Sequence, residues 1–563
     1  MTPVAAAMTA TAELQLAPAR ASVLVGLENV GKSALFRNLA RADCGDESNF
    51  RGSTVDCRRQ WLDELRGELV DTPGIRVRSD SATTTLALEQ LSNADRLILV
   101  VRSTDAWREL QTLLDALPPL RQRVCILHTF ADKQPPGLDA LQHFCRTVLG
   151  APCLALDARR LDELQRQRLL ATIEQSACLP INAAQLLETA TPSGTPAVNP
   201  PRTPFEHPLL GPLLALCCLG LLFALPVYLA FQLSERVQPW LDSGLIQPIA
   251  ARLESAPELL QHLLTGSYGV LSLGLYSFVW AFPVVVLIGL SVALCEESGL
   301  KDRITTALDP SLRRIGLSGQ DLIPVLTGFG CNVVAVFQSR ACSACSRRAC
   351  IGAIAFGSAC SYQIGATLSV FNASGQPLLF LPYILLLTAV SALHTRLWNG
   401  PLDPVSSTPL SERAFLQWPS YRAVLWRLRS AVRQFLWQAM PIFLAICLVA
   451  SLLDWLDALD RLGRLIAPAM ALFRLPEEMA PGLIFSLLRK DGLLVLNFDA
   501  GQPLAQLAPG QIFLLAWLAS TFSACLVTLW AIGREIGTRF AITLAARQAT
   551  SSLLVAGMLA LFL

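Results

Sequence analysis

Long apolar runs fill most of the chain after residue 206, whereas the first 197 or so residues have the composition of a soluble domain. A helix needs about 20 apolar residues to cross the hydrocarbon of a bilayer. The runs lie at 208–232, 268–295, 351–372, 377–397, 435–456, 478–497, 511–532 and 541–563. The pattern therefore predicts an α-helical, polytopic membrane domain over 206–563, with about eight membrane helices.

A further apolar segment, near 321–340, is short and interrupted by proline and glycine. It reads Ile323-Pro-Val-Leu-Thr-Gly-Phe-Gly-Cys-Asn-Val-Val-Ala-Val-Phe337, a pattern typical of a broken or re-entrant helix. Irregular backbone at membrane depth is tolerated only where protein covers it or where it lines a cavity. We therefore expect this segment to line a cavity in the membrane domain.

Basic residues in the loops predict the orientation of the chain. Arginine and lysine gather after the second run and between the fourth and fifth runs, and loops rich in these residues face the cytosol. The members are Lys301, Arg303, Arg313, Arg314, Arg396, Arg413, Arg422, Arg427, Arg429 and Arg433. The loop at 233–266 has no basic excess. We therefore expect a multi-pass protein of the bacterial inner (plasma) membrane, with its N-terminal domain in the cytosol.

Composition narrows the class further. Of 563 residues, 53% are hydrophobic and only 16% are charged, below the roughly 25% of ordinary soluble proteins. A net charge of +2 without a basic tail gives no sign of nucleic acid as a partner. Several of the 16 cysteines lie inside apolar runs, where free thiols behave as small hydrophobes, so a secreted disulfide framework is not expected. The N-terminus shows no signal-peptide pattern.

Four segments follow from these patterns. Residues 1–20 form a flexible N-terminus, 21–165 a Ras-like α/β P-loop GTPase domain, and 166–205 a short helical segment with a Pro-rich linker. The linker stretch, 191–204, contains five prolines and is expected to be extended. The membrane domain occupies 206–563.

A phosphate-binding loop opens the first domain. The apolar strand Ser22-Val-Leu-Val25 runs into Gly26-Leu-Glu-Asn-Val-Gly-Lys-Ser33, and a helical pattern follows. Strand, glycine loop and helix are the context that a P-loop requires. Lys32 would place its charge near the β- and γ-phosphates, and the Ser33 hydroxyl would ligate Mg²⁺. The expected nucleotide contacts in this loop are Gly26, Glu28, Asn29, Val30, Gly31, Lys32, Ser33 and Ala34.

Further segments indicate GTP. Leu69-Val-Asp-Thr-Pro-Gly74 follows a strand, where Asp71 would act on Mg²⁺ through the second sphere and the Gly74 amide would lie near the γ-phosphate. Thr54, between the P-loop and Asp71, has the place of a switch threonine that binds Mg²⁺, although an ordinary surface threonine fits equally well.

The segments expected to read the base come later in the chain. Thr129-Phe-Ala-Asp132 is a variant of the guanine-reading motif without its lysine, and Asp157-Ala158 has the position of the last base-contacting loop. Because the motif is imperfect, ATP stays an alternative to GTP.

Four polar or glycine-containing motifs follow one another in the first half of the membrane domain, namely Glu296-Glu-Ser-Gly299, Ile315-Gly-Leu-Ser-Gly319, Gly328-Phe-Gly-Cys-Asn-Val333 and Arg340. In their order and spacing the membrane domain resembles the FeoB family of ferrous-iron transporters. Later, Arg489-Lys-Asp-Gly492 is similar to its Lys-Glu element. Cys525, Thr528 and Arg534-Glu535 are similar to its Pro-Cys-x-x-Thr segment and the Arg/Lys-Glu pair that follows.

The resemblance implies a function and a set of ligands. It implies that GTP hydrolysis, with Asn29, Lys32 and Thr54 as catalytic residues and K⁺ assisting through Asn29, controls Fe²⁺ passage between two gate-like pseudo-repeats. Cys331 and Cys525 would be corresponding pore cysteines of the two halves. Thiols, an amide and carboxylates suit a borderline divalent metal. The expected metal ligands are Cys331, Asn332, Cys525, Glu296, Asp491 and Glu535.

Departures from the family leave alternatives open. Val334 and Ala524 replace usual prolines, Glu28 replaces a P-loop proline, and the helical segment after the GTPase domain is short. Another divalent metal, or a membrane-anchored regulatory GTPase without transport, therefore stays possible. The resemblance also leaves open a small cytosolic accessory protein and a homo-oligomer. The cysteines at 342, 345, 350 and 360 form either a metal or redox cluster or a loop with incidental thiols, the latter favoured.

Overall fold

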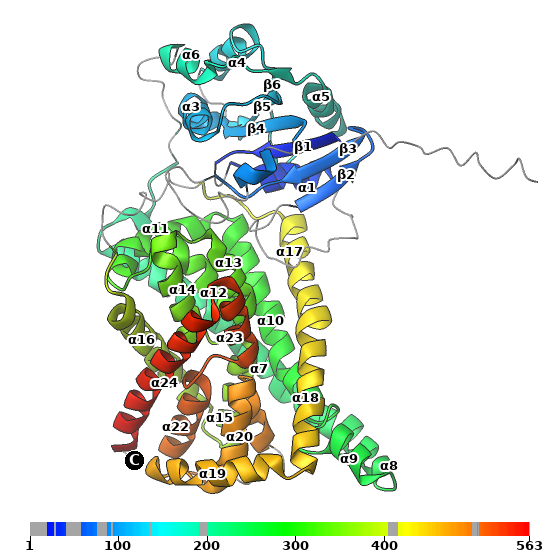
Figure 1. Ribbon diagram of the computed structural model, residues 1–563, viewed down its shortest axis with the longest axis vertical. Coiled ribbons are helices and arrows are strands. Elements are labelled where there is room, and N and C mark those ends of the chain that lie inside the picture. Colours follow the sequence, from blue (N-terminus) through cyan, green and yellow to red (C-terminus); the bar gives the residue numbers. More distant parts are fainter. Residues whose placement is uncertain are drawn as a thin grey trace, which may run out of the picture. The chain divides into compact units, whose positions relative to one another are not determined.

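The computed structural model describes residues 20–27, 30–40, 58–75, 87–91, 94–133, 137–190, 198, 200–402, 415–497, 504 and 506–561. The chain forms two compact units, divided near residue 199, and each is described by itself. The first is an α/β unit and the second is helical (Figure 1).

The first unit is built on a twisted sheet with the strand order β2-β3-β1-β4-β5-β6, with β7 paired to β5. Strands β3, β1, β4, β5 and β6 are parallel, whereas β2 and β7 are antiparallel to their neighbours. The strands are β1 (Arg20–Val25), β2 (Arg58–Leu62), β3 (Gly67–Asp71), β4 (Arg96–Arg102), β5 (Arg123–Thr129), β6 (Cys153–Ala155) and β7 (Ala177–Cys178).

Helices cover both faces of this sheet. Helices α1 (Lys32–Leu39) and α5 (Glu163–Glu174) pack on one face, and α3 (Ala106–Ala116), α4 (Leu138–Thr147) and α6 (Ala183–Ala190) pack on the other. Strand β4 sends Leu97, Leu99 and Val101 to one core and Ile98 and Val100 to the other. This accounts for its unbroken apolar run, since parallel strands in α/β proteins are buried on both faces.

The predicted boundary at residue 165 is wrong, because it cuts through α5. The side chains of Leu169 and Ile173 in α5 are fully buried against the sheet, and Leu187 in α6 is buried on its other face. Residues 166–190 therefore belong to the α/β unit and are not a separate helical segment.

The second unit contains one element order twice (Figure 1). Each copy consists of a long helix, a shorter helix, a short hairpin and a broken helix, in that order. In the first copy these are α10, α11, α12–α13 and α14–α15, and in the second they are α17–α18, α19, α20–η10 and α22–α23. Helices α11 and α19 lie at opposite ends of the unit (Figure 1). This is the arrangement of an inverted repeat, as many transporters have.

The bounds in the first copy are α10 (Leu273–Glu297), α11 (Leu300–Arg313), α12 (Leu322–Gly328), α13 (Asn332–Gln338), α14 (Ala344–Gly357) and α15 (Ser361–Ala373). In the second they are α17 (Tyr421–Gln434), α18 (Met440–Trp455), α19 (Ala458–Leu472), α20 (Ala480–Leu488), η10 (Gly492–Asn497), α22 (Pro509–Thr521) and α23 (Leu526–Glu535). The remaining helices are α7 (Leu210–Leu241), α8 (Gln247–Leu253), α9 (Glu258–Thr265), α16 (Phe380–Asn399) and α24 (Thr538–Leu561).

Seven stretches in the described part of the chain are long and apolar enough to cross a membrane. The predicted run at 478–497 is not among them, because the chain breaks after α20 at Arg489 and continues as a 3₁₀ turn. Of the most apolar 18 residues in the span Ala344–Ala373, 89% are buried within the protein, whereas in Leu210–Leu253 the share is 22%. The broken helices are thus central, and α7 presents exposed leucines suited to lipid.

Candidate nucleotide site and thiol junction

The P-loop connects β1 to α1, as predicted. Gly26 passes so close to β4 that an added Cβ would lie 2.3 Å from the Val100 carbonyl oxygen, and Gly31 precedes α1 with φ of 89°. Both positions therefore require glycine. The buried Lys32 ammonium donates hydrogen bonds to the carbonyl oxygens of Gly26 (2.9 Å) and Leu27 (2.7 Å), so the lysine lies over the loop.

The segment after β3 lies beside this loop. The amide of Ile75 donates to the Gly26 carbonyl oxygen at 3.0 Å, which brings the preceding Gly74 next to the P-loop. Asp71, at the end of β3, is fully buried. The hydroxyl of Thr72 donates to the Leu24 carbonyl oxygen at 2.6 Å. The structure thus brings together the loop and the Asp71–Gly74 segment, as the sequence predicts.

Two segments predicted to read the base also reach the P-loop. The Thr129 hydroxyl at the end of β5 donates to the Val30 carbonyl oxygen at 2.6 Å. The Asn38 amide of α1 donates to the Ala158 carbonyl oxygen at 2.6 Å, and the Ala158 Cβ lies 3.7 Å from an ideal Cβ on Gly31. One residue of each predicted base-reading segment therefore contacts the P-loop or the helix that follows it.

The acidic members of these segments are less buried. Asp132 is exposed and pairs with Lys133 at 2.8 Å, and Asp157 accepts from the amide of Arg159 at 2.9 Å. Ser33 and Ala34, in the first turn of α1, are half-buried. Glu28, Asn29 and Thr54 lie outside the described residues, so the structure leaves their predicted roles untested.

Short hairpins and helix breaks meet in the helical unit. At the tip of the α12–α13 hairpin, the Gly330 carbonyl oxygen accepts from the hydroxyl of Ser361 (2.9 Å) and from its amide (3.3 Å), at the break between α14 and α15. At the second tip, the Lys490 ammonium donates to the carbonyl oxygens of Ser520 and Ser523, at the break between α22 and α23. Each hairpin thus docks on one broken helix.

Three thiols gather where these elements meet. Cys331, Cys360 and Cys525 each occupy the residue before a helix, namely α13, α15 and α23. Each of the three lies within electrostatic range of the other two. Amide groups at a helix N-terminus stabilise negative charge. We call Cys331, Cys360, Cys525 and the adjacent Asn332 the thiol junction.

The junction contains an unsatisfied oxygen. Asn332 is 3% exposed, and its Oδ1 has no hydrogen-bond partner among the described residues. Buried polar atoms are nearly always hydrogen-bonded, and an exception requires an explanation such as an ion. The Cys525 thiol lies 3.0 Å from the Thr528 hydroxyl, the other member of its predicted motif.

The implied correspondence between Cys331 and Cys525 is wrong. Cys331 lies at a hairpin tip, and its counterpart in the second copy is the tip at 489–491. Cys525 lies at a helix break, and its counterpart is Cys360. The repeated tripeptide Ser-Ala-Cys, at 358–360 and again at 523–525, is the sequence signal that could have identified Cys360.

The carboxylates predicted as metal ligands lie in ion pairs. The Asp491 oxygens accept from the Arg489 guanidinium at 2.9 Å each, and Asp491 also accepts from the Ser277 hydroxyl at 2.5 Å. Glu535 pairs with Arg340 (2.6 Å) and Arg347 (2.9 Å).

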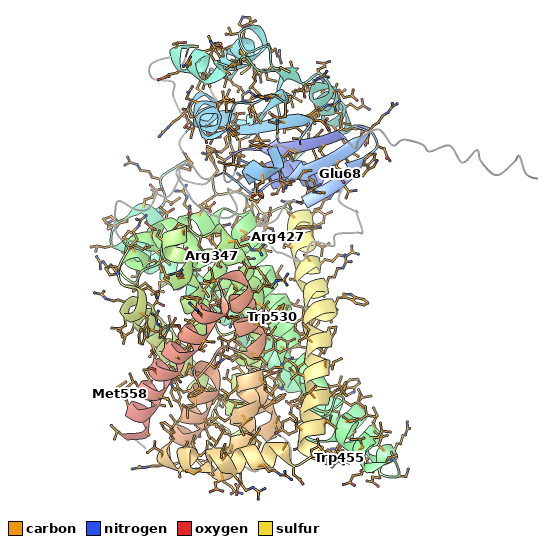
Figure 2. The ribbon with its side chains drawn as sticks, viewed as in Figure 1. Glu68, Arg347, Arg427, Trp455, Trp530 and Met558 are labelled. Carbon is orange, nitrogen blue, oxygen red and sulfur yellow. The ribbon has the colours of Figure 1, made fainter. Side chains whose placement is uncertain are left out.

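Glu296 contacts the Arg427 guanidinium and the Lys301 ammonium. Figure 2 labels Arg347 and Arg427, which lie toward the same end of the helical unit. Because arginine or lysine already neutralises each carboxylate, the ion pairs favour a positioning role for Glu296, Asp491 and Glu535, and their predicted role as metal ligands stays untested.

Family models match both units. A model described as a 50S ribosome-binding GTPase matches residues 21–129. A model described as a nucleoside-recognition gate matches residues 278–374 and 436–539, one segment in each copy of the repeated element order. The expected two gate-like repeats are therefore confirmed.

Individual relatives agree with these models. The Fe(2+) transporter FeoB of Synechocystis is 23% identical over 563 aligned positions, which cover 90% of this chain and 88% of the relative. FeoB of Helicobacter pylori is 25% identical, over 56% of this chain and 53% of the relative, so that alignment spans about half of the relative's length.

Among solved structures, NFeoB of S. thermophilus bound to GDP.AlF4- and K+ is 22% identical. It covers 31% of this chain and 66% of its own, with a TM-score of 0.23. The GTPase model, the gate model in both repeats and the match over nine tenths of the chain place this protein in the FeoB family, as a short and divergent member with an N-terminal GTPase domain.

Proposed function

We propose that this protein takes up ferrous iron across the bacterial inner membrane through the thiol junction, under the control of GTP in its cytosolic domain. The convergence of Cys331, Cys360 and Cys525 with the unsatisfied amide oxygen of Asn332 carries the proposal. Polar groups inside a membrane domain are costly and usually mark an ion pathway.

The ligand set suits the proposed cargo. Thiols are soft ligands and an amide oxygen is a hard one, and a mixed set favours a borderline ion such as Fe²⁺ over Mg²⁺ or Ca²⁺. Within the spans of the described residues, the only histidine is His394, whose ring stacks on Phe356 and forms a hydrogen bond with the Ser551 hydroxyl. A histidine-based pathway therefore has no support in the described residues.

The phosphate loop fits a guanine nucleotide with Mg²⁺. Gly26 lets the loop pass close to β4, Gly31 takes the left-handed conformation before α1, and Lys32 is held over the loop. Backbone amides at such a helix N-terminus bind phosphate oxygens. Ser33 would ligate Mg²⁺ and Asp71 would act through a water, with Thr54 closing the site. The nucleotide and Mg²⁺ supply a γ-phosphate whose presence orders the neighbouring segments. A role for K⁺ through Asn29 is part of the same proposal.

Iron uptake by cells provides the test. We expect single variants Cys331→Ser, Cys360→Ser and Cys525→Ser each to lower ⁵⁵Fe²⁺ uptake at least 10-fold, and Lys32→Ala to abolish GTP-dependent uptake. Cys345→Ser is the matched control, because Cys345 is an exposed thiol on α14 outside the junction. Unchanged uptake in all three junction variants, at equal protein levels in the membrane, would refute the proposal.

Two further measurements separate the alternatives. Competition by Mn²⁺, Zn²⁺ and Co²⁺ tests another divalent metal on the same scaffold, since the true cargo must compete best. A regulatory GTPase without transport predicts full GTP hydrolysis and no cation flux in liposomes. An accessory protein and a homo-oligomer remain predictions of the family resemblance.

A further inference from the structure

A second group of metal-binding side chains lies apart from the thiol junction. Asp321 ends the short helix η5 (Gly319–Asp321), which leads into the α12–α13 hairpin. Cys342 follows η6 (Ser339–Ala341), which leaves that hairpin, and Cys350 lies in α14. One ligand atom from each residue lies within 4.8 Å of the others. The two ends of the hairpin thus meet α14 at these three side chains.

All three side chains are buried, with exposed fractions of 0% for Asp321, 3% for Cys342 and 0% for Cys350. Cys345, five residues before Cys350 on α14, is exposed and lies outside the cluster. The C-x-x-C spacing of Cys342 and Cys345 is therefore not the ligand pair, because the structure pairs Cys342 with Cys350.

The Asp321 carboxylate is held in position without a cationic partner. Its Oδ2 accepts from the amide (2.6 Å) and hydroxyl (2.9 Å) of Ser318, and its Oδ1 accepts from the Ser346 hydroxyl at 3.0 Å. Within the described ranges no lysine or arginine forms an ion pair with it. Buried carboxylates are normally paired or bound to a metal. A carboxylate has about four acceptor positions, so Oδ1 can still bind a cation.

We propose that Asp321, Cys342 and Cys350 bind a thiophilic divalent cation of the Zn²⁺ and Fe²⁺ class. Two sulfur ligands and one oxygen ligand form three corners of a tetrahedron, with water or the Ser346 hydroxyl at the fourth. Binding deprotonates the two thiols, whose protons pass to solvent, and the metal forms two bonds to sulfur and one to oxygen. The divalent cation offsets two of the three negative charges that the two thiolates and the carboxylate then carry.

Buried thiols alone would not support this site, since both cysteines also belong to an apolar cluster with Ile351 and Ile354. The carboxylate distinguishes the two cases, because it caps η5 through Ser318 and yet lies beside buried thiols without a lysine or arginine partner among the described residues. A cation here would fasten both ends of the hairpin to α14, and the same hairpin carries Cys331 at its tip. The site would thereby fix the position of the hairpin.

Cobalt titration of the reduced, full-length protein in detergent tests the site. Co²⁺ bound to thiolates gives a sulfur-to-metal charge-transfer absorption in the near ultraviolet. The background carries C331S, C360S and C525S, so that the thiol junction contributes nothing. We expect this background to bind about one Co²⁺ with the charge-transfer band, C342S/C350S to remove the band, and the control C345S to keep it.

Asp321→Asn tests the carboxylate separately. It keeps both thiols and should keep the band while weakening Co²⁺ binding at least about 10-fold. A background protein without the band, a band that survives C342S/C350S, or an unchanged affinity in D321N overturns the proposal. If the background variant does not fold, the otherwise wild-type chain decides, because C342S/C350S must lower its Co²⁺ stoichiometry by one. None of these measurements involves transport, so they do not depend on the proposed function.

Discussion

The Arg489–Asp491 pair offers the sharpest test of the packing around the thiol junction. Both charges are buried, with side-chain exposures of 8% and 1%. The Arg489 guanidinium lies 3.8 Å from the centre of the Phe443 ring and 4.5 Å from that of Tyr362, so aromatic faces cover it. Asp491→Asn removes the carboxylate charge at nearly constant volume and leaves this guanidinium without an anion.

Removing one partner of a buried ion pair costs about 3–5 kcal/mol, because the remaining charge is desolvated without compensation. Desolvated cation–π contacts contribute about 2 kcal/mol or more, but they are present both before and after the substitution and so do not change the difference. Replacing both partners with neutral groups of similar volume is nearly neutral. We therefore expect D491N to be less stable than the double variant R489M/D491N.

The assay is thermal unfolding of the purified full-length protein in detergent. At roughly 2 °C per kcal/mol, D491N should lower the melting temperature by about 6–10 °C, and the double variant should regain most of this loss. A double variant as unstable as D491N would refute the reasoning. If instead D491N abolishes iron uptake at an unchanged melting temperature, Asp491 is a metal ligand and its assignment to a positioning role is wrong.

Three further predictions concern the GTPase domain. Gly26→Ala should weaken binding of a fluorescent GTP analogue at least about 5-fold, because its Cβ would lie 2.3 Å from the Val100 carbonyl oxygen and overpacking costs about 1–3 kcal/mol. Thr129→Val should lower the free energy of unfolding by about 1–3 kcal/mol in a denaturant titration, because it leaves the buried Val30 carbonyl oxygen without its 2.6 Å donor; an unchanged midpoint contradicts this. Burial, reinforced by the charge of Arg146, lowers the pKa of His128 to about 4. Between pH 6.5 and pH 4 the unfolded chain therefore binds a proton at this histidine that the folded chain does not. The free energy of unfolding falls as the pH decreases through this range, by up to ~3 kcal/mol. His128→Gln should flatten the melting temperature between pH 7 and pH 5 relative to the wild-type protein.

Local patterns predict the α/β unit and its phosphate loop because their determinants are adjacent in the chain. Gly26 to Ser33 follow a strand directly, and in the structure they connect β1 to α1, with Gly26 hydrogen-bonded to Ile75 just after the Asp71–Gly74 segment. Residue 165 was predicted as a boundary because the FeoB resemblance implies a helical segment after the GTPase domain. Its burial depends on a contact with the distant β-sheet that no local pattern displays.

The membrane domain shows the limit of hydropathy. The runs 351–372 and 511–532 are continuous in the sequence, yet the helices are interrupted at 358–360 and 522–525. At each interruption a docked hairpin supplies hydrogen bonds in place of those that a continuous helix would form. Glu296 and Glu535 were predicted as ligands from the family resemblance, and the sequence does not reveal their arginine partners. Arg427 and Arg340 lie more than a hundred residues from these acids and meet them only in the folded chain.

Cation flux into liposomes that contain the purified protein tests the central claim most directly. A fluorescent chelator inside the liposomes reports Fe²⁺ entry with GTP, with GDP and without nucleotide. We predict flux with GTP that is lost in Lys32→Ala and in the triple variant C331S/C360S/C525S, and that persists in C345S. Equal flux in the triple variant and the wild-type protein, or no flux under any nucleotide condition, would contradict a GTP-controlled pathway through the thiol junction.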